Sequence, residues 1–69
     1  MPLSLVDMNT TNTIKRINGT DDQKHHLQNL GFVIGANVSV VCRSHGNLIV
    51  KIMDSRVALS EQLANKIMV

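Results

Sequence analysis

The sequence predicts a mainly β domain: a small closed or partly open barrel of about five strands, with one short helix after the first strand and a helical turn before the last. Three observations predict this fold. Segments 37–43 and 47–53 alternate in hydrophobicity, as half-buried strands do. Segment 20–31 carries helix signals at both of its ends. The chain has 69 residues, a length that supports a single hydrophobic core.

The first elements expected are a strand over residues 13–17 and a helix over 21–30. β-Branched side chains dominate the strand, and Asn18-Gly19 ends it. Thr20 is placed to cap the helix, and Gln23, three residues later, completes a capping box. The helix is therefore predicted to begin directly after Thr20.

The end of this helix is marked by a glycine and the only aromatic residue of the chain. Gly31 suits the left-handed position just past a helix end. In that motif Phe32 folds back onto Leu27, which gives the aromatic ring a structural role. The apolar side of the helix consists of Leu27 and Leu30, so the helix covers one side of a core built elsewhere. Gly35 is interpreted as the turn that enters the next strand.

The next two strands form a hairpin whose core faces follow from placing the charged residues outward. The side chains expected to face the core are Val38, Val40 and Cys42 in the first strand and Leu48, Val50 and Ile52 in the second. These faces meet when Val40 pairs with Val50. That register predicts a three-residue loop, Ser44-His45-Gly46, with Gly46 in the left-handed bulge position.

The C-terminal part is expected to close the barrel. Asp54-Ser55 forms a turn into a short strand over 56–59, and Ser60 caps a helical turn that runs through Lys66. Residues 67–69 form the last strand. Closure is favourable because free sheet edges invite aggregation.

Composition excludes several functional classes. Cys42 is the single cysteine, so no internal disulfide forms and a reducing cytoplasm is expected. No apolar run is long enough for a signal peptide or a membrane-spanning helix. No nucleophile, base and orienting group can be assembled into a catalytic set. We therefore expect one non-enzymatic domain over 1–69 that binds no cofactor.

Nucleic acid is not an expected partner. Seven Lys and Arg stand against five Asp and Glu, and a net charge of +2 is too weak to indicate nucleic-acid binding. Binders of this size usually stack bases on aromatic rings, and Phe32 is the only aromatic residue. The residues Lys15, Arg16, Arg43, Lys51 and Arg56 are interpreted as a solvated charged surface.

Five blocks along the chain resemble one protein family in their order and spacing. They are Pro2-Leu3-Ser4-Leu5, Ile14-Lys15-Arg16-Ile17-Asn18-Gly19, Leu27-Gln28-Asn29-Leu30-Gly31-Phe32-Val33-Ile34-Gly35, Val38-Ser39-Val40, and Ala58-Leu59-Ser60 with Ala64 and Ile67-Met68-Val69. The chain resembles the ferrous iron transport protein A family (FeoA), whose members are small cytosolic SH3-like domains. Asn9 and Asn12 stand where that family usually has glycine, and the loop around His45 is shorter than in many members.

The resemblance implies an SH3-like barrel and a function. Members of the family are accessories of the membrane ferrous-iron transporter that carries a G-protein domain (FeoB), and they act by protein–protein contact. The same module also occurs at the end of metal-dependent transcriptional repressors. A stand-alone regulatory module of that kind is therefore an alternative. Peptide-binding SH3 domains dock proline-rich ligands in aromatic-lined grooves, so this chain must recognise its partner by another surface.

The outward face of the central hairpin is the first candidate for that surface. Apolar side chains alternate there with basic ones, and clustered apolar groups on a surface mark docking sites. The residues expected in the contact are Val41, Arg43, His45, Ile49, Lys51 and Met53. The alternative is that the last strand or the N-terminal segment covers them.

Two pairs of residues have metal-ligand chemistry. Cys42 and His45 form a C-x-x-H pair, and Asp22 and His26 share a helix face. A stable site needs three or four ligands, and each pair supplies two. The alternative readings are a buried thiol at Cys42 and charges that stabilise the helix start. We assign no metal site to one chain, whereas a second chain could supply further ligands. A divalent-metal sensor or carrier, and weak self-association, therefore stay open as alternatives.

Overall fold

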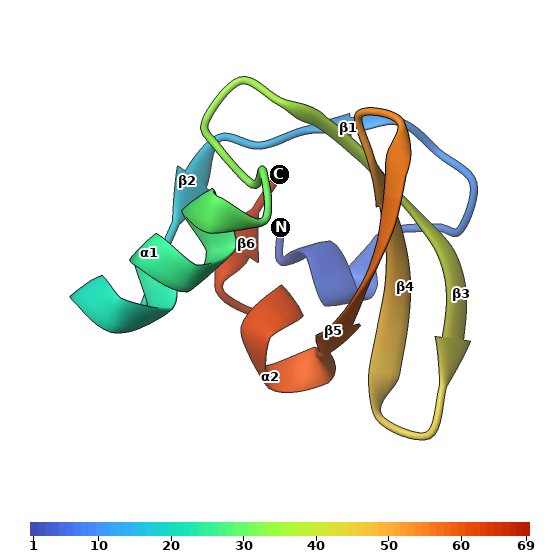
Figure 1. The fold of residues 1–69 in the computed structure, drawn as a ribbon. Coiled ribbons are helices and arrows are strands. Elements are labelled where there is room, and N and C mark those ends of the chain that lie inside the picture. The colour runs from blue at the N-terminus through green and yellow to red at the C-terminus, as the bar shows by residue number, and fades with distance from the viewer.

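Six strands in two antiparallel sheets and three short helical segments make up the computed structural model, which describes residues 1–69 (Figure 1). The larger sheet has the strand order β1-β3-β4-β5 and the smaller sheet pairs β2 with β6. The strands are β1 (Asn12–Thr13), β2 (Arg16–Ile17), β3 (Asn37–Ser44), β4 (Asn47–Ile52), β5 (Ser55–Ser60) and β6 (Ile67–Met68). The helical segments are the 3-10 turn η1 (Leu3–Leu5), α1 (Asp21–Asn29) and α2 (Glu61–Ala64). The mainly β fold, with a helix early and a helical turn before the last strand, is confirmed.

The segment 13–17, expected to be one strand, is divided between the two sheets. β1 pairs with β3, whereas β2 pairs with β6. Between them, the backbone N–H of Ile14 donates to the carbonyl of Ala36 at 2.9 Å, and Lys15 donates to Met68 at 2.8 Å. The chain therefore changes sheets at Ile14, whose side chain is buried in the core. β-Branched composition marks this segment as extended but does not show that its two ends have different partners.

Helix α1 begins as predicted. The side-chain hydroxyl of Thr20 accepts from the backbone N–H of Gln23 at 3.2 Å, and the Gln23 side chain accepts from the Thr20 N–H at 3.0 Å. Asp21 and Asp22 lie in the first turn, where the helix dipole favours negative charge. The capping box therefore satisfies N–H groups that have no partner within the helix.

The end of α1 also follows the prediction. Gly31 has a φ of +102°, and its N–H donates to the carbonyl of Gln28 at 3.0 Å. The N–H of Phe32 donates to Leu27 at 3.0 Å, which completes the expected C-cap motif. Phe32 and Leu27 are both fully buried. Gly35, at a φ of +92°, donates to Ile14 at 2.8 Å and leads the chain into β3.

The β3–β4 hairpin has the predicted register but reaches it by another route. Val40 pairs with Val50, as expected. The loop, however, is a two-residue His45-Gly46 turn, in which both residues have positive φ, and not a three-residue loop. A β-bulge at Val41 adds the residue that the shorter turn lacks. Because of the bulge, Val40 can pair with Val50 although the strands are joined by a two-residue turn.

The bulge corrects two side-chain orientations beyond Val40. Cys42 pairs with Ile49 on the outer face and is exposed, so the expectation that it faces the core is wrong. Arg43 pairs with Leu48 on the inner face, so its expected outward orientation is also wrong. Its guanidinium donates to the carbonyl oxygens of Ser4, at 3.0 Å, and Val6. A residue inserted at Val41 reverses the alternation for every later position of β3.

The C-terminal elements close the barrel. The turn after β4 consists of Met53-Asp54 and not of Asp54-Ser55, because Ser55 already pairs with Ile52. Ser60 caps α2 by accepting from the N–H of Leu63 at 3.2 Å, as predicted. The two chain ends lie side by side in Figure 1, and the N–H of Val69 donates to the carbonyl of Met1 at 2.8 Å.

The core consists of aliphatic side chains around one aromatic ring. All of its members are apolar, and no buried side-chain polar atom lacks a partner. The core residues are Leu3, Val6, Ile14, Leu27, Phe32, Val38, Val40, Leu48, Val50, Ile52, Leu59, Ala64 and Ile67. None of the helices has the length and apolar character needed to cross a membrane.

Candidate docking site

The outward face of β3, β4 and β5 carries two rows of side chains that run across the strands. One row is apolar and consists of Cys42, Ile49 and Ala58. The other is polar and basic and consists of Ser39, Lys51 and Arg56. We call these six residues the outer sheet face. Side chains paired directly across strands contact one another, so each row is a continuous strip of surface.

The basic row places two like charges directly opposite each other. Lys51 on β4 pairs with Arg56 on β5, and both side chains are exposed. Like charges at paired positions destabilise a sheet. No acidic residue belongs to the outer sheet face. An acidic group on a partner would relieve this repulsion, so the face is electrostatically complementary to an acidic surface.

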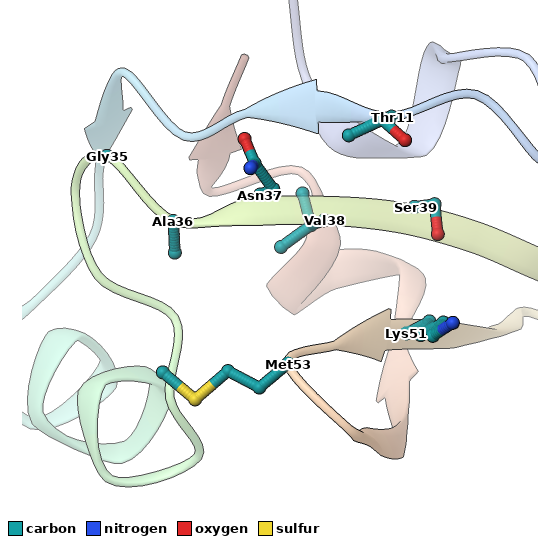
Figure 2. A pocket seen from close by; sticks show the side chains of 8 residues that line it. All are labelled: Thr11, Gly35, Ala36, Asn37, Val38, Ser39, Lys51 and Met53. Carbon is teal, nitrogen blue, oxygen red and sulfur yellow. The ribbon is translucent and has the colours of Figure 1, made fainter.

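An open groove of about 450 Å³ adjoins the basic row. Figure 2 shows β3 running between Thr11 on one side and Lys51 and Met53 on the other. Met53 lies in the turn after β4, and its side chain is 71% exposed. The groove lining consists of Thr11, Gly35, Ala36, Asn37, Val38, Ser39, Lys51 and Met53. It extends the basic row toward an exposed thioether, a flexible apolar group suited to contacts with a partner.

The six residues expected in the partner contact are divided between two places. Ile49 and Lys51 lie on the outer sheet face, Met53 lines the adjoining groove, and Val41 is the half-buried bulge residue. Arg43 and His45 instead line a separate hollow at the hairpin tip. Ile49, Lys51 and Met53 therefore lie together on the outer sheet face and its groove. Arg43 and His45 lie apart from them, at the hairpin tip.

The four candidate metal ligands do not come together. Asp22 and His26 lie on α1, Cys42 lies on β3 and His45 lies in the hairpin turn. No group of three or more His, Cys, Asp or Glu side chains has the spacing to hold a metal ion. One chain thus offers at most isolated pairs of ligands.

Sequence reasoning did not include four members of the outer sheet face in the expected contact: Ser39, Cys42, Arg56 and Ala58. Alternation within a strand shows which residues share a face but not which strands lie next to each other. The pairing of β5 with β4 brings Arg56 and Ala58 beside Lys51 and Ile49. The expected turn at Asp54-Ser55 joins these two strands but lies one residue later than the observed Met53-Asp54 turn, so it does not give this register.

A second groove, of about 590 Å³, was also not predicted. It runs between α1 and the loop that follows, and includes Lys24 and His25 of the helix and Val33 and Ile34 of the loop. Ile34 is 70% exposed. The sequence feature that could have indicated this groove is the apolar pair Val33-Ile34, which lies between Gly31 and Gly35.

The sequence matches the FeoA domain family over residues 1–69. A crystal structure described as an iron uptake regulatory protein (FeoA) is 26% identical to this chain, with a TM-score of 0.86 over 96% of this chain and 88% of that one. A crystal structure of FeoA from Stenotrophomonas maltophilia complexed with zinc, described as an SH3 domain protein, is also 26% identical. Its TM-score is 0.85 over 99% of this chain and 87% of that one.

A manganese-dependent transcriptional repressor shares the fold. It is 21% identical, with a TM-score of 0.89 over 97% of this chain, and the present chain spans 39% of its length. No curated protein matches the sequence. The expected SH3-like architecture is confirmed by these similarities.

Proposed function

Because this chain belongs to the FeoA domain family, which is associated with ferrous iron transport, we propose that it is a cytoplasmic, non-enzymatic accessory of ferrous iron uptake. It acts by binding the cytosolic G-protein part of the membrane ferrous-iron transporter. The observation that carries this proposal is the outer sheet face, in which an apolar row lies beside a basic row that has no acidic counterpart.

The chemistry of the face suits protein recognition. Ile49 and Ala58 supply apolar contact area, and Lys51 and Arg56 supply charges that select an acidic partner. Regulation follows if the G-protein domain presents its acidic surface differently in its nucleotide states. Binding then shifts the population of those states by the difference in affinity between them.

A titration of the ¹⁵N-labelled protein with the soluble G-protein domain tests the proposal. The domain is used nucleotide-free, with GDP and with a non-hydrolysable GTP analogue. We expect amide shifts centred on β4 and β5 in at least one state. Absence of binding in all three states would overturn the proposed function.

Charge reversal at the face sharpens this test. Lys51→Glu is expected to weaken binding by roughly tenfold or more, because it replaces an attraction by a repulsion. Lys15→Glu is the matched control, since Lys15 is exposed but lies outside the outer sheet face. Equal weakening by both variants would indicate a nonspecific charge effect and would contradict docking at this face.

Divalent-metal binding is the second candidate function. Two observations favour it: a FeoA structure similar to this one is complexed with zinc, and Cys42 is exposed here. A second chain would have to complete the ligand set. Anaerobic calorimetry with Zn²⁺ and Fe²⁺ on the native protein and on Cys42→Ser decides this. Binding that is millimolar or weaker rules out this function, and tighter binding that is unchanged by the substitution rules out Cys42 as a ligand.

A further inference from the structure

Strand β5 forms one edge of the larger sheet. It pairs with β4 on one side and has no strand on the other, and Figure 1 shows it next to β4. The pairing is regular over all six of its residues, without a bulge. The strand contains no proline. β5 thus lacks the bulges and prolines that natural proteins commonly use to blunt an exposed edge.

The register identifies the backbone groups at this edge. Ile52 and Ser55 flank a two-residue turn, so they exchange ladder hydrogen bonds, and so do Val50 with Val57 and Leu48 with Leu59 at alternate positions. The N–H and C=O groups of Arg56 and Ala58 therefore point away from β4. No backbone hydrogen bond outside the regular elements involves either residue.

Hydrogen bonding on the β3 side of the sheet also indicates that the backbone groups of Arg56 face away from β4. The carbonyl of Val40 accepts from the N–H of Asn9 at 2.8 Å, so the backbone groups of Val40 face away from β4. Ser39 then exchanges its ladder bonds with Lys51, and the backbone groups of Lys51 face β3. Arg56, which pairs with Lys51, is left with its own groups at the open edge.

We propose that the edge of β5 at Arg56 and Ala58 is a strand-addition site for an extended acidic segment of a partner protein. A fifth strand added here would receive backbone hydrogen bonds from both residues. This inference adds a binding mode to the proposed function. It rests on the proposed function only in one respect, that the partner protein is the transporter.

The two rows of the outer sheet face specify the side chains of the added strand. A residue opposite Arg56 extends the row of Ser39, Lys51 and Arg56, and an acid at that position pairs directly with Arg56, whose charge is repelled by Lys51 on its other side. A residue opposite Ala58 extends the apolar row. The residue between them faces Val57, which is half-buried on the inner side. The partner segment therefore carries an acid and two apolar residues in succession.

Charge also argues against a second copy of this chain as the occupant. In an antiparallel pair of two β5 strands centred on Ala58, Arg56 of each copy lies opposite Ser60 of the other. That register leaves the repulsion between Lys51 and Arg56 unrelieved. An acidic residue opposite Arg56 offsets it.

The test uses a peptide of sequence Thr-Val-Val-Val-Glu-Thr, blocked at both ends, which places its glutamate opposite Arg56 in the antiparallel direction. The readout is amide hydrogen exchange by NMR. We expect the amides of Arg56 and Ala58 to gain protection on binding, while those of Val57 and Leu59, already in the ladder, change little. The same peptide with lysine in place of glutamate is the control and is expected to bind at least tenfold more weakly.

Two substitutions separate backbone addition from other contacts. Ala58→Pro removes an N–H that has no partner in the free protein, so it leaves the ladder intact and is expected to weaken peptide binding by roughly tenfold. Ala58→Val keeps the N–H and is expected to bind like the native protein. If Ala58→Pro does not fold, Arg56→Glu replaces it and is expected to prefer the lysine peptide.

Three outcomes would overturn the proposal. They are undiminished binding by Ala58→Pro, peptide-induced shifts that lie away from β5, and concentration-dependent protection of Arg56 and Ala58 in the free protein, which would indicate self-pairing. The peptide assay contains no transporter, so failure of the proposed function does not affect it. Conversely, a G-protein domain that binds the native protein and Ala58→Pro equally would overturn strand addition and leave the proposed function in place.

Discussion

Cys42 illustrates how one inserted residue determines the chemistry of a side chain. Because the bulge at Val41 turns Cys42 outward beside Ile49, its thiol is exposed. We expect a water-soluble maleimide to modify Cys42 in the folded protein at a rate within roughly tenfold of that in the unfolded chain, because accessibility limits the reaction of a buried thiol. Mass spectrometry of native and denatured samples measures both rates. Labelling that requires denaturant would contradict the outward orientation of Cys42.

Arg43, the next residue, has a structural role in place of the expected role in docking. Its guanidinium donates to the carbonyl oxygens of Ser4 and Val6, and so attaches the N-terminal segment to the hairpin. We expect Arg43→Ala to lower the free energy of unfolding by about 1–2 kcal/mol, since hydrogen bonds from a charged donor are lost at a partly exposed site. Urea denaturation measures the loss.

Arg56→Ala is the matched control for this change. Arg56 is also an exposed arginine on the same sheet, but its side chain makes no hydrogen bond within the protein. Its removal is expected to change stability by no more than about 0.5 kcal/mol. Equal losses for the two variants would refute the attachment role of Arg43.

At the scale of elements, helix α1 depends on its two ends more than on its apolar side. Thr20 caps its start, and only Leu27 among its residues is fully buried. We expect Thr20→Ala to cost about 1 kcal/mol of stability, whereas Thr20→Ser, which keeps the hydroxyl, costs little. Thr11→Ala at an exposed position is the control. Thermal unfolding compares the three, and an unchanged melting temperature for Thr20→Ala would show that the cap contributes nothing.

The elements also show which features can be predicted from sequence. The capping box at Thr20 and the turn at Gly31 are local, because each motif satisfies groups within a few residues of itself. The change of sheet at Ile14 depends on pairing with distant segments, and the bulge at Val41 depends on how β3 pairs with β4, so neither follows from the residue pattern of its own strand. The same holds for the docking site. Alternation within β4 predicts Ile49 and Lys51, but Arg56 requires knowledge of how β4 pairs with β5.

At the scale of the whole molecule, the seam at the chain ends and the edge of β5 differ in their backbone hydrogen bonding. The chain ends hold one seam together, because Met1 and Val69 exchange hydrogen bonds at 2.8 and 3.0 Å and Pro2 bridges Met68. The edge of β5 has no such partner. The backbone groups of Arg56 and Ala58 are therefore left without a strand partner beside the basic row of the outer sheet face.

The core of so small a barrel depends strongly on its single aromatic ring. Phe32 is fully buried and has the largest side chain among the core residues. Phe32→Ala is expected to cost about 3–5 kcal/mol, because it leaves a cavity that aliphatic neighbours fill only in part. Small domains have total stabilities near the lower end of about 5–15 kcal/mol, so this variant should be largely unfolded at 37 °C. Phe32→Leu, which keeps most of the volume, should remain folded with a cooperative but weaker transition. Urea denaturation and the dispersion of amide resonances distinguish the two variants, and a cooperative, near-native transition for Phe32→Ala would show that the aliphatic residues sustain the core without the ring.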